Sequence, residues 1–384
     1  MTIGISTDWP NLIPLKRVNK HLGNHMSWPT PQNSKNRVRT AGKRVAKVMS
    51  EHNGLLQWGL FISEDEYDVL ENWRTAHGAV LNTAQAWLRG LEKDQVPIVG
   101  QRLKRLNTII DKLATGRARD LSTMNDIAGV RLIFRSEQEL WTFREKMSAS
   151  RAKHLLTHEV GRFDYINRPK STGYRGLHDV FERRVKNVPG QSPWDGLKFE
   201  VQLRTAVQHA WATAVEVYDS VQSVRFKFGA SQSASYNQFL FISEVFARFH
   251  EGRNSCLPDL SDQDLFTKIE ALESETGMIA LFRSLSIAQS HTTLKENSIL
   301  QRTHEGKLVV YTFRNFMEAI RAISEIEARD ETADAVLVGA KSPQHIREAF
   351  RNYFDDTSDF IQLFDDAELQ ARAQTVVGLL NKNK

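Results

Sequence analysis

Apolar and polar positions alternate strictly in residues 197–204. Leu197, Phe199, Val201 and Leu203 fall on one side of an extended backbone, and the positions between them are Lys198, Glu200, Gln202 and Arg204. A period of two residues is typical of a half-buried β-strand, so we expect one apolar face and one polar face. The polar face is either a solvated outer surface or the wall of a site, and the surrounding sequence must decide between them.

Helical spacing dominates the first part of the chain. After an irregular, proline-containing stretch over residues 1–34, apolar residues at intervals of three and four from Val38 to Val48 predict a helix. A second helix is expected to begin at Ser63, where Ser-Glu-Asp-Glu matches a capping box, and to continue to Leu88. We therefore expect residues 1–95 to form a basic, helical N-terminal region.

Strands and helices alternate in the middle of the chain, residues 96–229. Residues 97–115 carry an apolar stripe with their cations off it, which predicts a basic amphipathic helix. Strands are expected over residues 127–134, 155–166, 176–185 and 197–203, and helices over residues 136–149 and 205–220. This alternation predicts an α/β unit with a mixed sheet.

The last region, residues 230–384, is expected to be mainly helical up to about residue 300. A small βαβα segment follows, with strands at 307–313 and 335–338 and helices at 315–328 and 343–354, before an acidic terminal helix. This region contains no recognisable chemistry. A role as a surface for a homo-oligomer or a regulatory partner is assigned to it only by elimination.

Composition narrows the class of protein. The chain has 384 residues, of which 41% are hydrophobic and 25% charged, and a net charge of +5, as expected for a globular protein with more than one packed unit. The single cysteine, Cys256, excludes an internal disulfide framework and a cysteine-rich zinc site. No apolar run is long enough to span a membrane, so we expect a cytoplasmic protein that does not bind membranes.

Positive charge is concentrated at the start of the chain. Residues 1–50 contain nine Lys and Arg residues against one acid, Asp8. Such a segment suits a polyphosphate or RNA partner, because neutralising phosphates supplies most of the non-specific binding energy. A solubilising helix face with a flexible tail is the alternative.

Three kinds of group near the polar strand suit phosphoryl transfer. Asp126 at the entrance of the 127–134 strand and Glu200 form a carboxylate pair that can hold Mg²⁺ together with substrate phosphates. The cations of residues 97–115 suit a polyphosphate tail. The loop from Lys170 to Tyr174 adds a cation and an aromatic ring that could stack on a base. Neither a Walker-type phosphate loop nor a dinucleotide fingerprint occurs.

Five segments between about Gly100 and Asp219 resemble the synthetase domain of the RelA/SpoT family, in the family's order. They are Arg102-x-Lys104 with Thr108-Ile109-x-x-Lys112, Asp126-Ile127-x-Gly129-x-Arg131, Tyr165-Ile166-x-x-Pro169-Lys170-x-Thr172-Gly173-Tyr174-x-x-Leu177-His178, Glu200-x-Gln202-x-Arg204-Thr205, and His209-Ala210-Trp211-Ala212. The resemblance implies a nucleotidyltransferase-like mixed sheet flanked by helices, of α/β (α+β) class, with helical N-terminal and mainly helical C-terminal extensions.

The resemblance also implies a reaction, the transfer of the β,γ-pyrophosphate of ATP to the ribose 3′-hydroxyl of GTP or GDP, giving (p)ppGpp. By matching positions it assigns catalysis and Mg²⁺ binding to Asp126 and Glu200. It assigns ATP binding to Arg102, Lys104, Lys112 and Arg131. It assigns acceptor binding to Lys170, Thr172, Tyr174, His178, Gln202 and Arg204. For His178 and His209, a structural role is the alternative.

The chain departs from the family pattern at two places. Thr172 stands where the acceptor loop usually has Asn, which leaves the identity of the acceptor open. Residues 1–95 contain no His-Asp pair of the kind found in the family's hydrolase domain, so we expect synthesis without hydrolysis. Two alternatives stay open: a toxin-type enzyme that modifies the 3′-CCA end of tRNA, and a catalytically silent nucleotide-binding module.

Overall fold

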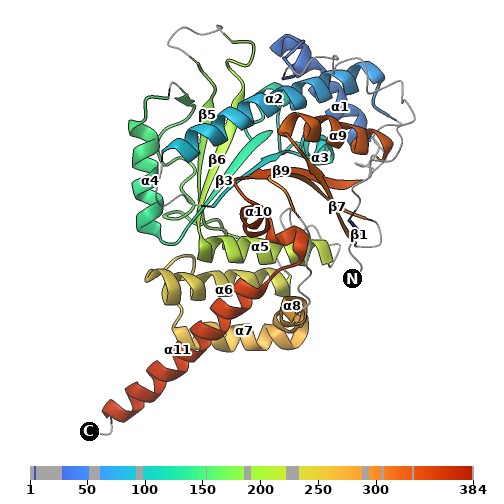
Figure 1. Cartoon of the computed structure of the whole chain (residues 1–384). Coiled ribbons are helices and arrows are strands. Elements are labelled where there is room, and N and C mark those ends of the chain that lie inside the picture. Colours follow the sequence, from blue (N-terminus) through green and yellow to red (C-terminus); the bar gives the residue numbers. More distant parts are fainter. Residues whose placement is uncertain are drawn as a thin grey trace.

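The fold is built on one mixed β-sheet with helices on both faces (Figure 1). The structure is a computed structural model and describes residues 4–5, 28–51, 61–91, 98–152, 154–185, 192–221, 233–287, 294–303, 307–330 and 333–382. Within these residues the sheet has nine strands in the order β1-β8-β7-β9-β2-β3-β6-β5-β4. The predicted α/β class with a mixed sheet is confirmed.

The centre of the sheet is formed by three strands. β3 (Ala128–Phe134) is buried throughout, pairs antiparallel with β2 (Ile98–Leu103) and runs parallel to β6 (Lys198–Thr205). β5 (Leu177–Glu182) and the short β4 (Leu155–Leu156) extend this half. The predicted alternation in β6 is confirmed, because Phe199, Val201 and Leu203 are fully buried whereas Glu200 and Gln202 are only half-buried.

The apolar face of the sheet is covered by a layer of helices, visible across the top of Figure 1. These are α1 (Lys35–Glu51), α2 (Glu64–Gly90), α3 (Leu106–Ala114) and α9 (Phe316–Arg329), and α4 (Glu137–Ala149) packs beside β6. The two predicted N-terminal helices are confirmed. Ser63 caps α2 by accepting from the amide of Glu66, as its sequence pattern predicts.

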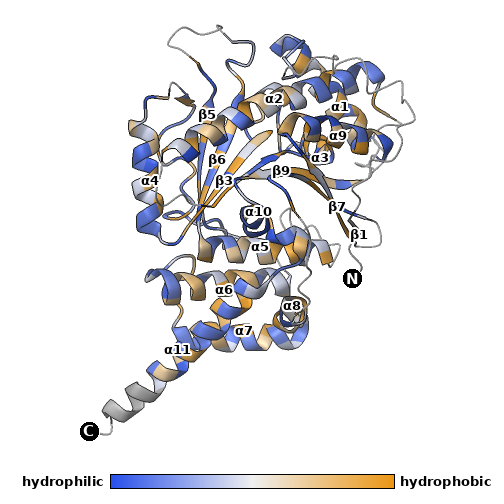
Figure 2. Ribbon diagram, in the orientation of Figure 1, coloured by the Kyte–Doolittle hydropathy of each residue, from blue (hydrophilic) through white to orange (hydrophobic). Residues whose placement is uncertain are grey.

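The opposite face meets a second helical layer. α5 (Ala206–Val221) follows β6 directly and packs with α6 (Ala234–Glu251), α7 (Asp262–Thr276), α8 (Met278–Ile287) and α11 (Ser358–Lys382) around a separate apolar core. Figure 2 shows both polar and apolar residues along these helices, and the buried apolar ones form that core. No helix among the described ranges is both long enough and apolar enough to cross a membrane.

The C-terminal strands continue the same sheet. β7 (Asn297–Arg302), β8 (Leu308–Phe313) and β9 (Asp334–Ala340) join it where β9 pairs with β2, with Ala340 opposite Gly100. β1 (Gly4–Ile5) pairs in parallel with β8 at the edge. The sheet therefore crosses the expected boundary at residue 229.

A short segment after β9 turns back over the polar face of the sheet. It comprises α10 (Pro343–Ala349) and the 3₁₀ helix η4 (Arg351–Phe354), in place of the continuous helix expected over residues 343–354. α10 lies directly on β2, because a Cβ added at Gly100 would meet the Cβ of Ala349 at 2.6 Å. This contact brings the C-terminal region to the polar side of the central strands.

Three sequence predictions are wrong. Residues 97–115 are not one helix but β2 and α3, because strand pairing on both sides of residues 100–103 overrides the helical spacing. Residues 157–166 are loop and turns rather than a continuous strand, with one isolated bridge from Asp164 to Leu177. Asp164 Oδ1 accepts from the amides of Ile166 and Asn167. Residues 297–302 form β7 although a mainly helical stretch was expected there.

Candidate active site

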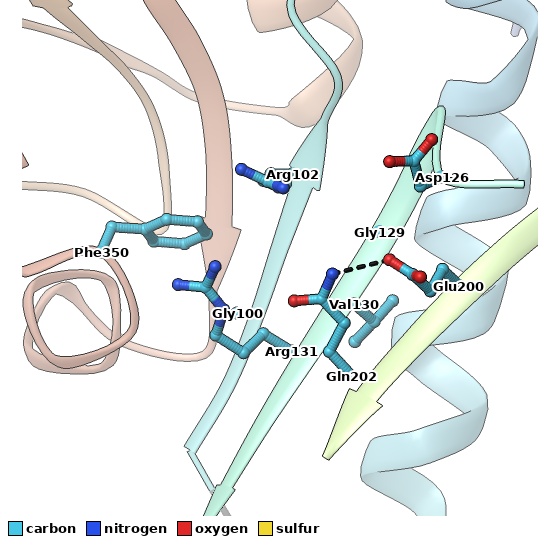
Figure 3. A pocket seen from close by; sticks show the side chains of 9 residues that line it. All are labelled: Gly100, Arg102, Asp126, Gly129, Val130, Arg131, Glu200, Gln202 and Phe350. Carbon is cyan, nitrogen blue, oxygen red and sulfur yellow. Dashed lines mark hydrogen bonds between the residues drawn. The ribbon is translucent and has the colours of Figure 1, made fainter. Parts of the chain in front are cut away.

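The polar face of the central strands borders a small cavity (Figure 3). It is lined by Gly100, Arg102, Asp126, Gly129, Val130, Arg131, Glu200, Gln202 and Phe350. Gly129 is the register partner of both Glu200 and Arg102. Because Gly129 has no side chain, charged groups from β2 and β6 face each other across β3.

Asp126 precedes β3 and lies between two ammonium groups. Its Oδ2 accepts from Lys104 Nζ at 2.8 Å and from Lys112 Nζ at 2.6 Å. Burial alone would raise the pKa of Asp126, but the two lysines outweigh it and hold the pKa below its usual range. Burial lowers the pKa of Lys104 to about 8 although Asp126 opposes that change. We call this part of the site, with Arg102 and Arg131, the donor side.

Arg131 connects the donor side to the C-terminal segment. Its Nη1 donates to the carbonyl of Ala349 at 2.8 Å, and its guanidinium lies 5.8 Å from the centre of the Phe350 ring. Burial, and secondly the neighbouring Arg204, lower the pKa of Arg131 to about 9. Phe350 is itself almost fully buried and closes the cavity from this side.

The space left in the cavity is small. Its volume is about 10 Å³, which is enough for about one water molecule. Sites for drug-sized ligands usually measure roughly 300–1,000 Å³. With Phe350 in this position, the enclosed space is much smaller than a nucleotide.

On the other side of Glu200, five polar side chains form a closed ring of hydrogen bonds, which we call the acceptor side. Glu200 Oε1 lies 3.0 Å from His178 Nδ1, and His178 Nε2 lies 2.6 Å from the hydroxyl of Tyr174. That hydroxyl accepts from Arg204 Nη2 at 3.0 Å, Arg204 approaches Gln202 Oε1 at 3.5 Å, and Gln202 Nε2 donates to Glu200 Oε2 at 2.6 Å.

The ring sets the charges of its members. Burial alone would lower the pKa of His178, but Tyr174 and Glu200 raise it to about 9. Burial alone would raise the pKa of Glu200, but the imidazolium of His178 holds it below its usual range. Arg204, followed by His178, lowers the pKa of Tyr174 to about 7 against the effect of burial. At neutral pH, Glu200 is therefore a carboxylate and His178 is an imidazolium.

Lys170 and Thr172 lie on the loop beside the ring and do not line the cavity. Lys170 Nζ lies 4.3 Å from the centre of the Tyr165 ring and 5.1 Å from that of Tyr174. Thr172 Oγ1 accepts from the amide of Tyr174 at 3.3 Å, so its hydroxyl shapes the loop. The aromatic side chain of Tyr174 was expected to stack on a base. Its hydroxyl takes part in the ring of hydrogen bonds with His178 and Arg204.

The predicted site residues thus fall into two connected groups. Arg102, Asp126, Arg131, Glu200 and Gln202 line one cavity, and Lys104 and Lys112 reach it through Asp126. Tyr174, His178 and Arg204 reach it through the ring. His209 donates from Nε2 to the carbonyl of Glu348 at 2.9 Å, which is a structural contact.

Phe350 is a lining residue that sequence reasoning missed. It lies 150 residues beyond Glu200 in the chain, in a region without recognisable chemistry. The periodicity of its own segment contains no signal for a contact with β2. Only the β9–β2 pairing, which is not visible in the sequence, brings it to the site.

The described part of the basic N-terminus is largely neutralised by acids. Arg37 pairs with Asp65, Arg44 with Glu66, and Arg39 with Asp120. Lys16, Arg17 and Lys20 lie outside the described residues. The described helix α1 therefore offers less free positive charge to an RNA than its sequence suggests.

The two carboxylates fit a magnesium ion that is shared with a substrate. Asp126 and Glu200 line the same cavity and are close enough for the charge of Asp126 to oppose ionisation of Glu200. Within the described ranges no group of three or more His, Cys, Asp or Glu side chains could hold a metal by itself. Mg²⁺ commonly binds through one or two carboxylates and completes its coordination with phosphates and water.

Comparison with known sequences points to one family. The sequence profile described as "Region found in RelA / SpoT proteins" matches residues 101–219. GTP pyrophosphokinase YjbM of Bacillus subtilis (strain 168) is 29% identical over 126 residues, which cover 32% of this chain and 56% of that protein. GTP pyrophosphokinase YwaC of the same organism is 30% identical over 118 residues, covering 29% and 52%. The chain thus spans about half the length of these curated relatives.

Among solved structures, the crystal structure of the small alarmone synthetase 1 from Bacillus subtilis is similar to part of the chain. The two share 22% sequence identity with a TM-score of 0.37, over 48% of this chain and 92% of the other. All twelve site residues predicted from the sequence, from Arg102 to Arg204, lie within the residues 101–219 that the profile matches. The two lines of sequence reasoning, motif and profile, therefore point to the same segment.

Proposed function

We propose, from the match of residues 101–219 to the RelA/SpoT profile, that the protein is a cytoplasmic ATP-dependent pyrophosphotransferase that makes (p)ppGpp from GTP or GDP. The observation that carries the proposal is the convergence on one cavity of Asp126 and Glu200, which are 74 residues apart in sequence, with the cations of β2, α3 and β3. A site that only bound a neutral ligand would not need paired acids among four cations.

The donor side would bind the triphosphate of ATP. Lys104, Lys112, Arg102 and Arg131 supply positive charge that is spread over β2, β3 and α3, which matches the charge spread over a transferred pyrophosphoryl group. Asp126 and Glu200 would hold Mg²⁺, which would supply positive charge to offset the negative charge of the phosphates. The lysines now paired with Asp126 would exchange part of that contact for phosphate.

The acceptor side would orient the attacking 3′-hydroxyl. Glu200 is ionised at neutral pH because His178 stabilises its charge, and a carboxylate with such a low pKa is a weak base. We therefore assign to Glu200 the orientation of the hydroxyl by a charge-assisted hydrogen bond rather than complete proton abstraction before attack. Gln202 and His178 fix both of its oxygens for this task.

The test follows the label of [γ-³²P]ATP in the presence of Mg²⁺. The full chain is incubated separately with GTP, GDP, ATP or bulk tRNA as acceptor, and the labelled products are separated. The proposal predicts that label moves to GTP or GDP and that AMP is released in equal amount. If none of the acceptors becomes labelled, the protein is a silent nucleotide-binding module and the proposal is wrong.

One observation favours a second candidate, transfer to the 3′ end of tRNA. Arg162, Arg168 and Lys170 are exposed on the loop that precedes Tyr174, where they could contact the phosphates of a longer acceptor. The ion pairs of α1 do not support an RNA contact there. Label on tRNA alone in the same experiment would select this candidate over (p)ppGpp synthesis.

A further inference from the structure

Helix α6 presents three polar side chains to the acceptor loop, which we define as residues 170–176. Tyr236, Ser243 and Glu251 are spaced by seven and eight residues, which is close to two helical turns each, so they lie along one face of the helix. Tyr236 is 8% exposed, Ser243 is 1% exposed and the side chain of Glu251 is 4% exposed. Polar groups buried this deeply need partners.

All three find their partners within five consecutive residues of the loop. The hydroxyl of Tyr236 donates to the carbonyl of Ser171 at 2.8 Å, and Ser243 Oγ donates to the carbonyl of Gly173 at 2.5 Å. Glu251 forms a buried ion pair with Arg175. The loop is thus attached to α6 at three residues. Ser171 and Gly173 precede Tyr174, and Arg175 follows it.

The backbone of the loop lies directly against the helix. Gly173 has a φ of +88°, and a Cβ at this position would meet Ser243 Cβ at 3.0 Å and Leu240 Cα at 3.2 Å. Within the loop, the amide of Gly173 donates to the carbonyl of Lys170 at 2.9 Å, and the amide of Lys170 donates to the carbonyl of Tyr174 at 3.1 Å. The turn that carries Lys170 and Tyr174 is therefore closed on itself and fixed from one side.

The same contacts reach the strand that carries Glu200. Glu251 Oε1 accepts from Thr205 Oγ1 at 2.7 Å and from Gln208 Nε2 at 2.9 Å, at the junction of β6 and α5. Arg175 Nε approaches Ser243 Oγ at 3.4 Å. Glu251 thus connects the loop to Thr205 at the end of β6, three positions after Gln202 and next to Arg204. The loop and the strand are therefore held in one geometry.

We propose that α6 is a clamp for the acceptor loop, in which Tyr236, Ser243 and Glu251 are positioning residues for acceptor binding. They act through the loop backbone, which places Tyr174 in the ring with His178 and Arg204 and holds Lys170 above the Tyr165 ring. The proposal rests on the proposed function and gives the helical region after residue 230 a direct part in it. A helix that only filled space would not direct three of its buried polar groups at one short loop.

The test uses Tyr236→Phe and Ser243→Ala in the full chain, with Tyr218→Phe as the matched control. Tyr218 also makes a buried hydroxyl hydrogen bond in the same helical layer, but its partner is Ser235 at 2.7 Å, which is not a loop residue. The KM of the nucleotide acceptor and the KM of ATP are measured separately for each variant. Loss of one hydrogen bond predicts an increase of about two- to tenfold in the acceptor KM, with the KM of ATP unchanged.

A second measurement does not depend on activity. Hydrogen exchange of the loop amides, residues 170–176, is compared between wild type and variants by mass spectrometry. We expect faster exchange in the loop for Tyr236→Phe and Ser243→Ala, and wild-type exchange there for Tyr218→Phe. Thermal unfolding of each variant checks that the fold is kept.

The outcomes separate the clamp from the proposed function. Equal changes in the KM of both substrates, or loop exchange that matches wild type, would overturn the clamp. If the wild-type protein transfers no label but the variants exchange faster in the loop, the clamp holds and the proposed function fails. If transfer occurs and only the acceptor KM rises, both stand.

Discussion

The charged side chains of the donor side and those of the acceptor side have different kinds of partners. On the donor side, Lys104 and Lys112 share the single carboxylate of Asp126, and Arg131 donates to a carbonyl of the C-terminal segment. On the acceptor side, the polar ring around Glu200 is complete and the loop that carries Tyr174 is fixed by α6. For the proposed binding of a triphosphate, the donor groups would therefore have to change partners, whereas the acceptor groups already have their arrangement.

This difference follows from which elements form each side. The acceptor side is built from β5, β6 and a loop packed on α6, so its polar groups are supported by neighbours that are themselves buried. The donor side combines β2 and β3 with α10, a helix of seven residues that is distant in sequence. A short helix adds little stability of its own, so its place over β2 depends on tertiary contacts such as those of Phe350 and Ala349.

The largest effect is expected for Glu200→Gln, which keeps the size of the side chain and removes its charge. The ring would lose the ion pair with His178, and the site would lose one of its two acids. We expect turnover to fall by about 10²- to 10⁴-fold, measured as label transfer from [γ-³²P]ATP.

Binding of a non-hydrolysable ATP analogue separates the two sides in this variant. Since the role proposed for Glu200 is to orient the acceptor hydroxyl, we expect Glu200→Gln to retain most of its affinity for the analogue when binding is measured by calorimetry. Full turnover in the variant would show that the polar face of β6 is not the wall of the active site. Loss of both turnover and analogue binding would show that the two sides cannot be separated at Glu200.

Phe350→Ala tests whether the donor side is closed by the chain itself. The change removes the ring that borders Arg131 and the cavity, so we expect tighter binding of the ATP analogue. Truncating a buried phenylalanine also costs about 3–5 kcal/mol of stability, so we expect a lower Tm as well. The measurement is the Kd of the analogue at a temperature well below the Tm of the variant.

Phe354→Ala is the matched control for this change. Phe354 lies in the same segment, with Arg347 4.7 Å from its ring centre, but does not line the cavity. We expect it to lower Tm with no gain in affinity for the analogue. Weaker binding in Phe350→Ala than in Phe354→Ala would mean that Phe350 supports the donor site rather than closing it.

Sequence patterns predicted β6 better than the donor side. The reason is how far apart in the sequence the interacting residues lie. The alternation in residues 197–204 is local, and burial of Phe199 and Val201 follows from it directly. In residues 97–115 the local spacing predicted one helix, but pairing of β2 with both β3 and β9 decides the outcome for its first half. Partners of β2 that lie up to 240 residues away leave no mark on its periodicity.

The same limit applies to the site residues. Motif spacing selected Asp126 and Glu200, and the parallel pairing of β3 with β6 places them at the same cavity. It could not select Phe350, which has no chemical signature, or the contacts of Tyr236 and Ser243, which look like ordinary positions of an amphipathic helix. Buried polar residues on an otherwise apolar helix face are the signal that could have identified the latter pair.

Gly173→Ala tests the acceptor side at its closest backbone contact. An alanine at positive φ costs about 1–2 kcal/mol by itself, and here its Cβ would also press on Ser243 and Leu240. We expect a lower Tm and a higher KM for the acceptor. Gly161→Ala is the matched control, because Gly161 has a similar φ of +83° but open space around its Cβ. If both variants lower Tm equally and leave the acceptor KM unchanged, the loop is not held as closely as its contacts suggest.

The smallest effect concerns His209, which joins α5 to the C-terminal segment beside the donor side. Burial, and then the charges of Arg131 and Arg204, lower its pKa well below 6.5. The folded protein therefore keeps His209 neutral at pH values where the unfolded chain binds a proton. The stability that neutral His209 contributes is present above pH 6.5, the ordinary value, and is lost as the pH falls from there towards the folded pKa.

His209→Gln removes this titration and keeps a donor for the carbonyl of Glu348. His77 and His154, whose pKa values burial lowers to about 4, destabilise wild type and variant alike at low pH, so only the difference between the two proteins is informative. Between about pH 7.5 and about pH 5.5 the wild type should lose more stability than His209→Gln, by at most about 1.4 kcal/mol per pH unit below 6.5. Thermal or urea unfolding at both pH values measures this difference. Parallel losses would mean that His209 is solvated when α10 lies over β2, and that the donor side is more open than the acceptor side even before a nucleotide binds.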